Sequence, residues 1–313
     1  EGSINRVGEY AFGYCESLMK IDISVKELET GAFCGCASLK SVYIGPELAY
    51  MGLGILQGCD SLSEVVIPRM DRSIGLTAPS YFGYLFGAED STQNPQYVPE
   101  SVESVTVYAQ VVISDRAFEN CGYIKSIVIG NDCNKIGINV FKGCDSLESL
   151  SVPFVGERRV ESSSYGLEYF FSVVPQTLRA VKITGECFLV SDVFEGCDGI
   201  EELTLPYAGS APDMPKPLRY FYDSETPVLR TVTILGGREI ADGCFEGFYM
   251  LESVTLPESI ERIGINAFAG SGLKIIHFGG TVAQWNAIEK APGFDNGCTS
   301  YTVYCANGKV HKG

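Results

Sequence analysis

Cysteine is the residue with the most chemistry to offer in this chain, with twelve copies against two histidines. Metal sites made from these residue types need short, clustered spacings, and no Cys-x-x-Cys pair is present. Cys34 and Cys36 are two residues apart, which suits neither a zinc site nor an unstrained disulfide. Cys298 and Cys305 are the one pair spaced for a local disulfide. We therefore expect no metal site and no cofactor.

The two histidines are the candidates for a general base beside a cysteine or serine nucleophile. His311 lies close to the end of the chain, where order is usually low. His277 stands between Ile276 and Phe278, on the outward side of a predicted strand. No Gly-x-Ser-x-Gly turn is present in the sequence. The chain is therefore predicted not to be an enzyme, and a Cys–His or Ser–His dyad around His277 is the remaining catalytic hypothesis.

Six cysteines occupy one position of a repeated pattern, three residues after a Phe or Leu and three residues before a Leu or Ile. They are Cys15, Cys36, Cys59, Cys121, Cys144 and Cys197. Two weaker copies of the pattern carry Phe248 and Ser271 at this position. Free cysteine is among the most buried residue types. We predict that these side chains form a buried column, each packed against the copy in the next repeat.

The elements that position this column are indicated by the residues after each cysteine. Eleven segments follow the form Leu-x-x-Val-x-Ile, and their apolar pairs run from Ile21 and Ile23 to Ile276 and Phe278. Alternation of apolar and polar residues predicts a short, half-buried strand in each segment. Their usual spacing of about 22 residues lies in the range of leucine-rich repeats. We predict a right-handed, β-rich α/β solenoid, with about eleven parallel strands in one concave sheet about 48 Å across.

Three longer units interrupt the regular spacing, and the pattern stops before the C-terminus. The longer units are residues 68–104, 153–180 and 206–231. We assign residues 1–279 to the solenoid and residues 280–313 to a C-terminal capping segment. The segment contains a short amphipathic stretch around Trp285, and then a predicted hairpin with its turn at Asn307 and Gly308.

The outward positions of the predicted sheet are candidate ligand-binding residues, because solenoids commonly bind on a concave surface. These candidates are Tyr43, Glu64, Thr106, Lys182, Thr204, Thr233, Thr255 and His277. Ser and Thr also suit exposed strand positions, so β-propensity is an equal explanation of the row. A second set of candidates lies in the longer units: Tyr84, Tyr169 and Tyr220. Aromatic residues are enriched at interface hot spots, but they also fill cores, and core filling is the favoured interpretation here.

Acidic residues outnumber basic ones by 39 to 23, which gives a net charge of −16. This charge repels phosphate groups, so nucleic acid and anionic membranes are excluded as partners. No apolar run reaches the roughly 18 residues of a spanning helix, so we expect no direct membrane insertion. Residues 1–7 open inside a repeat, which we interpret as a chain trimmed from a longer protein.

The repeat is similar to the BspA-type leucine-rich repeat of bacterial and protozoan surface proteins. The unit of that family runs Ile-Gly-x-x-Ala-Phe-x-x-Cys-x-x-Leu-x-x-Ile-x-Ile-Pro, and it resembles residues 136–147 and 263–268 most closely. The tail from Gly280 through Trp285 to Cys305 also resembles a segment that closes such arrays in gut Firmicutes. The chain departs from the pattern in its three longer units and where the cysteine is replaced.

The resemblance implies a secreted or surface-attached bacterial protein, with an extracellular or cell-surface location. The function that it implies is non-enzymatic recognition, in adhesion or host interaction. The partner would be a protein or glycan on a host or neighbouring cell. The alternative is a rigid structural spacer that presents other domains of a longer surface protein.

Overall fold

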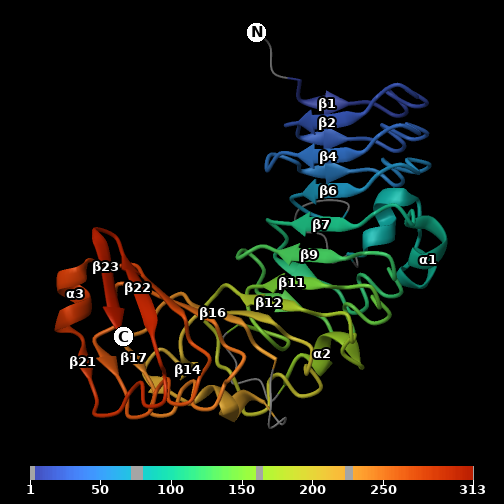
Figure 1. Cartoon of the computed structure of the whole chain (residues 1–313). Coiled ribbons are helices and arrows are strands. Elements are labelled where there is room, and N and C mark those ends of the chain that lie inside the picture. The colour runs from blue at the N-terminus through green and yellow to red at the C-terminus, as the bar shows by residue number, and fades with distance from the viewer. Residues whose placement is uncertain (1–3, 72–79, 160–164, 223–227, 313) are drawn as a thin grey trace. The chain divides into compact units, whose positions relative to one another are not determined.

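The computed structural model describes residues 4–71, 80–159, 165–222 and 228–312, and Figure 1 shows its elements in chain order. The chain forms two compact units. Unit 1 comprises Glu1–Val152 and Glu168–Thr177, and unit 2 comprises Pro153–Leu167 and Leu178–Gly313.

The described residues of unit 1 contain six parallel strands of four residues each, which we call its main strands. They are β2 (Lys20–Ile23), β4 (Ser41–Ile44), β6 (Glu64–Ile67), β7 (Ser104–Val107), β9 (Ser126–Ile129) and β11 (Ser149–Val152). Strand β4 illustrates the alternation: Val42 and Ile44 are 2 % and 0 % exposed, whereas Tyr43 between them is 39 % exposed. Successive side chains of a strand point to opposite faces, so one face of each strand enters the core and the other faces outward.

A second row of two-residue strands, the minor strands, also runs along unit 1. They are β1 (Arg6–Val7), β3 (Glu27–Leu28), β5 (Tyr50–Met51), β8 (Val112–Ile113) and β10 (Lys135–Ile136). Strands β1, β3 and β5 form one small sheet, and β8 pairs with β10. The sequence did not reveal this row, because two residues are too few to show a period. The coil between β5 and β8 contains the first longer unit, and its described residues include no minor strand.

Unit 2 repeats this plan in its described residues. Its main strands are β12 (Ala180–Ile183), β13 (Glu202–Leu205), β16 (Thr231–Ile234), β18 (Ser253–Leu256), β20 (Ile275–Phe278) and β22 (Tyr301–Cys305), and β23 (Gly308–Lys312) pairs antiparallel with β22. Its minor strands are β17 (Glu239–Ile240), β19 (Arg262–Ile263) and β21 (Glu289–Lys290). A separate antiparallel pair is formed by β14 (Gly209–Ala211) and β15 (Met214–Pro215).

The prediction of a leucine-rich-repeat solenoid is confirmed. In the described part of the chain, each of the eleven predicted segments forms a strand, from β2 to β20. The expected helix is α3 (Val282–Ala287), where Thr281 and Gln284 form a capping box, and the expected hairpin is β22–β23. Strand β22 also extends the row of main strands, because it pairs in parallel with β20. The role of residues 280–313 as a cap stays a prediction.

A column of aromatic rings fills the interior of unit 1 beside the cysteines. The Phe118 ring packs against Phe82 and Phe141, with centroid distances of 5.2 and 5.6 Å. Each coil is also tied to the next by backbone hydrogen bonds in the same region, and Phe118 donates its N–H to Val140 O at 2.9 Å. Stacked aromatic pairs stabilise beyond their buried area, so the column holds the coils in register.

Each of the three longer units contributes a short helix with buried aromatic residues, two of them in unit 1 and one in unit 2. They are the 3₁₀-helix η1 (Phe82–Phe86), helix α2 (Glu168–Phe171) and the 3₁₀-helix η3 (Leu218–Phe221). Each supplies a carbonyl to the preceding coil: Leu85 O accepts from Leu56 N at 2.8 Å, and Phe170 O accepts from Phe141 N at 2.9 Å. In unit 2, Phe221 O accepts from Phe194 N at 3.0 Å. The longer units therefore follow the hydrogen-bonding plan of the regular coils. The first of them continues into the 3₁₀-helix η2 (Ser91–Gln93) and α1 (Asn94–Tyr97).

A row of alternating charges crosses unit 2, with one residue immediately before each of the strands β12, β13, β16, β18 and β20. Its members are Arg179, Glu201, Arg230, Glu252 and Lys274. Glu252 pairs with Lys274 at 2.8 Å and with Arg230 at 3.9 Å. The Lys274 hydrogen bond lowers the pKa of Glu252, so the carboxylate stays charged. These side chains remain in contact with water, so their ion pairs add little to the free energy of unfolding. Their main effect is on which coils pair with one another, because each charge lies beside an opposite charge of the next coil.

Candidate binding surfaces

The predicted cysteine column is confirmed at five of its six positions. Cys36, Cys59, Cys121, Cys144 and Cys197 are all buried. At Cys36 and Cys144 the thiol donates to the backbone of the preceding coil, from Cys36 Sγ to Phe12 O at 3.2 Å and from Cys144 Sγ to Phe118 O at 3.2 Å. The prediction is wrong for Cys15, which is exposed. Cys15 belongs to the first described coil, so it has no described coil before it to pack against.

All twelve cysteines lie in the described part of the chain, and none of them forms a disulfide. Cys298 does not pair with Cys305. It continues the column instead, because its Sγ donates to Phe268 O at 3.1 Å and lies 3.6 Å from Ser271 Oγ. Among the described residues, no group of three or more His, Cys, Asp or Glu side chains is placed to hold a metal ion.

We expect the column cysteines to resist alkylation, because the thiolate is the reactive form of cysteine. Burial raises the pKa of Cys59 to about 12 and that of Cys244 to about 12. Iodoacetamide near neutral pH should therefore label exposed Cys15 in the folded chain and leave Cys59 and Cys244 unmodified until urea is added. Peptide mass spectrometry with and without urea measures this. Labelling of Cys59 in the folded chain at the rate of Cys15 would contradict it.

The two histidines have different surroundings, and their described contacts are with a tyrosine and a threonine. His277 is exposed on β20 and stacks on Tyr304 with a centroid distance of 5.6 Å. His311 Nδ1 lies 3.0 Å from Thr302 Oγ1 in the exposed hairpin β22–β23. A triad also needs a group that orients the imidazole and a set of oxyanion donors. The described contacts of the two histidines include neither.

The central outward positions of unit 1 form a continuous row, because its main strands pair in register. The row comprises Asp22, Tyr43, Val66, Thr106, Val128 and Ser151, and each is exposed or partly exposed. It contains the predicted Tyr43 and Thr106, and the predicted Glu64 lies in the next row beside them.

One feature of this surface was not predicted. The rings of Tyr43 and Tyr108 lie nearly parallel, 6.4 Å apart, and Tyr108 Oη donates to Ile44 O at 2.7 Å. Burial and the neighbouring Tyr43 raise the pKa of Tyr108, so its hydroxyl stays neutral. We call Tyr43 and Tyr108 the tyrosine pair.

The corresponding row of unit 2 contains the other five predicted positions in register. It comprises Lys182, Thr204, Thr233, Thr255, His277 and Tyr304. Lys182, His277 and Tyr304 are exposed, and the three threonines are partly exposed. Tyr304 was missed because it lies in the segment that was assigned to the cap.

The three tyrosines of the longer units occupy equivalent places in their short helices. Tyr84 and Tyr169 are half-buried, and Tyr220 is 38 % exposed. The residues beside them fill the core: Leu85, Phe170 and Phe221 are all 0 % exposed. Tyr84 Oη donates to Met51 O at 3.2 Å, and Lys216 Nζ lies 5.2 Å from the centre of the Tyr220 ring. The longer units therefore place one aromatic residue at the surface and the residue after it in the core.

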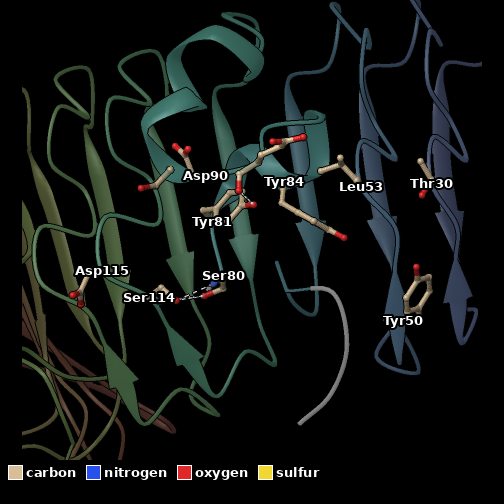
Figure 2. A pocket seen from close by; sticks show the side chains of 11 residues that line it. Thr30, Tyr50, Leu53, Ser80, Tyr81, Tyr84, Asp90, Ser114 and Asp115 are labelled. Atoms are coloured by element: carbon tan, nitrogen blue, oxygen red, sulfur yellow. Dashed lines mark hydrogen bonds between the residues drawn. The ribbon is translucent and has the colours of Figure 1, made fainter. Parts of the chain in front are cut away.

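Unit 1 also has a cleft of about 560 Å³ beside its first longer unit, which we call the insertion cleft (Figure 2). It is lined by Thr30, Tyr50, Leu53, Ser80, Tyr81, Tyr84, Glu89, Asp90, Ser91, Ser114 and Asp115. Figure 2 shows Tyr81, Tyr84 and Asp90 between Thr30 and Tyr50 on one side and Ser114 and Asp115 on the other. The cleft lies where the row of minor strands is interrupted, between β5 and β8.

Hydrogen bonds define the walls of the insertion cleft. Ser80 N donates to Ser114 Oγ at 2.8 Å, and Ser114 N donates to Ser80 Oγ at 3.1 Å. Asp115 Oδ1 accepts from Ile138 N at 3.1 Å. Asp90 caps η2 by accepting from Thr92 N at 2.8 Å. Of the lining residues, only Tyr84 was a predicted site residue; the others come together by coil stacking, which no local pattern reveals.

Comparison with known proteins identifies the repeat. The model of the BspA type leucine rich repeat region matches with six copies, over residues 1–82, 111–207 and 169–288. No curated protein matches the chain. In the described residues, no helix is long and apolar enough to cross a bilayer.

Several solved structures are similar to the chain. A leucine rich cell surface protein from Faecalibacterium prausnitzii A2-165 is 19 % identical, with 91 % of this chain and 86 % of that chain covered and a TM-score of 0.28. A leucine-rich repeat protein from Bacteroides ovatus ATCC 8483 is 16 % identical, with 96 % and 87 % covered and a TM-score of 0.28. The leucine rich repeat protein of T. pallidum is 19 % identical, with 85 % and 80 % covered and a TM-score of 0.22. At these TM-scores the whole chains superpose poorly, so the assignment depends on the repeat itself. By its repeat sequence, which the family model matches over most of its length, this chain belongs to the BspA-type leucine-rich-repeat family.

Proposed function

We propose that this chain is a non-enzymatic recognition module of a secreted or surface-attached bacterial protein. It binds a protein or glycan on a host or neighbouring cell, and so serves in adhesion or host interaction. The observation that carries this proposal is the in-register outward row of unit 1, in which Tyr43 stacks on Tyr108, the residue that follows β7.

The tyrosine pair supplies what a flat row of small residues lacks. Thr106, Val128 and Ser151 offer little contact area, whereas two parallel tyrosine rings offer a large, rigid aromatic surface. Tyrosine is enriched at the energetic centres of interfaces because it loses little conformational entropy on binding. The hydrogen bond from Tyr108 to Ile44 O holds one ring in place before a partner arrives.

A binding screen tests the proposal directly. The whole chain is presented to immobilised extracellular-matrix proteins and to a glycan array at physiological salt. We expect a partner whose binding to the chain is saturable. We expect Tyr43→Ala to weaken this binding by about tenfold or more, as truncation of a hot-spot residue does. Tyr123→Ala is the matched control, since Tyr123 is an exposed tyrosine of unit 1 that precedes β9 and is not part of the outward row.

The outcomes separate the two functions under consideration. Saturable binding that Tyr43→Ala weakens and Tyr123→Ala leaves unchanged supports recognition through the outward row. A partner that binds both variants like the unchanged chain would move the recognition surface elsewhere. No partner in either screen would contradict the proposal and favour the structural spacer.

A further inference from the structure

The insertion cleft carries negative charge that the described residues around it do not neutralise. Three carboxylates line it, from Glu89, Asp90 and Asp115, and its lining contains no Lys, Arg or His. None of the three forms an ion pair with a described residue, although many other carboxylates of the chain do. The hydrogen bonds from Thr92 lower the pKa of Asp90, which keeps this carboxylate ionised. The cleft therefore favours a cation over an anion.

The aromatic walls of the same cleft favour a particular kind of cation. Tyr50, Tyr81 and Tyr84 line it, and the Tyr81 and Tyr84 rings meet edge to face with a centroid distance of 6.0 Å. Burial and the charges of Asp90 and Glu89 raise the pKa of Tyr81, so the ring carries a neutral hydroxyl. Aromatic faces attract organic cations, and the planar guanidinium of arginine stacks on them better than a hydrated ammonium does. Carboxylates add the paired acceptors that a guanidinium binds.

Size and rigidity are consistent with a side chain delivered from another molecule. A volume of about 560 Å³ is within the range of ligand clefts, and it is larger than one side chain alone requires. The Ser80–Ser114 hydrogen bonds and the Ile138–Asp115 hydrogen bond fix one wall in advance. A fixed wall lowers the entropy cost of binding. A neutral sugar would satisfy the hydroxyl groups but would leave three carboxylates without a counter-charge.

We propose that the insertion cleft of unit 1 binds an arginine side chain presented by an exposed segment of a partner protein. This inference rests on the proposed recognition function and specifies its partner as a protein with an accessible arginine. The guanidinium lies among the carboxylates of Glu89, Asp90 and Asp115 and packs against the tyrosine walls. The longer unit 68–104 then has a role beyond filling the coil, because it supplies Tyr81, Tyr84, Glu89 and Asp90 to the cleft.

The test uses acetyl-arginine-amide as the probe, with the neutral acetyl-citrulline-amide and a methyl glycoside as comparisons. Binding to the whole chain is followed by NMR of the tyrosine rings, with the Tyr81 and Tyr84 signals assigned from the Tyr81→Phe and Tyr84→Phe variants. We expect saturable shifts of these signals with the arginine probe. Citrulline has the same shape without the charge, so we expect it to bind about tenfold more weakly or not at all. High salt should weaken the arginine probe, because it screens exposed charges.

Two substitutions examine the charge without disturbing the fold. Asp115→Asn retains the oxygen that accepts from Ile138 N, and we expect it to weaken arginine binding by about threefold to tenfold. Asp242→Asn is the matched control, since Asp242 Oδ1 accepts from Ile265 N at 2.8 Å in the same way but belongs to unit 2 and does not line the cleft. We expect it to leave arginine binding unchanged.

Each outcome bears on one proposal. Absence of a saturable shift with arginine, equal binding of citrulline, or saturation by the glycoside alone would overturn the arginine site. So would equal effects of Asp115→Asn and Asp242→Asn. If the chain binds a partner in the screen but fails these tests, the proposed recognition function stands and the arginine site is rejected. If the chain binds arginine in the cleft but no partner is detected in the screen, the arginine site stands and the proposed cell-surface role is rejected.

Discussion

Replacement of Phe118 by alanine is expected to lower the free energy of unfolding by about 3–5 kcal/mol, the usual cost of removing a buried aromatic ring. Phe118 is 0 % exposed and lies between the Phe82 and Phe141 rings. Its removal leaves a cavity in the middle of the aromatic column, with coils on both sides that cannot close without breaking their register. Urea denaturation of the whole chain, followed by circular dichroism, measures the loss.

The same substitution at the exposed end of the column is the control. Phe12 occupies the equivalent position in the first described coil, stacks on Phe33 at 5.4 Å, and is 43 % exposed. Phe12→Ala should therefore cost much less than Phe118→Ala. Because each coil contacts mainly its neighbours, the unfolding curve of the Phe118 variant can show more than one step. Equal losses at the two positions would contradict the view that the column carries the stability of unit 1.

Gly137→Ala is expected to destabilise the chain by about 1–3 kcal/mol through overpacking. A β-carbon at Gly137 would lie 2.2 Å from Asp115 N and 2.5 Å from Asp115 Cα, so the clash is with backbone of the preceding coil. Gly264 meets Asp242 in the same way, at 2.5 Å from its backbone nitrogen. This close approach is the physical reason for the Ile-Gly step of the repeat.

Gly122→Ala is the matched control for this prediction. A β-carbon there meets only Gly143 O, at 3.5 Å, which is ordinary contact. Both substitutions lower the conformational entropy of the unfolded chain in the same way. The difference between the urea midpoints of the two variants therefore measures the destabilisation caused by the clash at Gly137. Gly137 packs on Asp115, which lines the insertion cleft, so a β-carbon at Gly137 would displace Asp115. We therefore expect Gly137→Ala also to weaken arginine binding. A Gly137→Ala chain as stable as the Gly122→Ala chain would contradict the steric explanation.

The two proposals use different parts of unit 1. The outward row lies on the main strands and includes Tyr43 of the tyrosine pair, whereas the insertion cleft lies where the minor strands are interrupted. Tyr43→Ala and Asp115→Asn therefore report on separate surfaces. If both weaken binding to one partner, that partner contacts both surfaces of unit 1.

The repeating features of this chain could be predicted because each repeat encodes them locally. The alternation in a segment such as Val42–Ile44 depends only on the period of a strand, and the cysteine position depends only on the distance to the next Leu or Ile. Repetition made these weak signals specific. The minor strands and the exposure of Cys15 could not be predicted, because they depend on which coil lies on each side.

The candidate site shows the same division between local pattern and stacking. The sequence alone determined the solenoid fold, eleven of the twelve main strands and the outward positions, Tyr43 among them, because a side chain's direction follows from its place in a strand. Tyr108 and Tyr43 are 65 residues apart in the sequence, and only the tertiary structure brings them side by side. It also places Tyr50, Asp90 and Asp115 around one cleft. Residues in successive coils are adjacent only after the coils stack, and a longer unit between two coils changes which residues meet. That arrangement is a property of the packed chain, and no single repeat contains it.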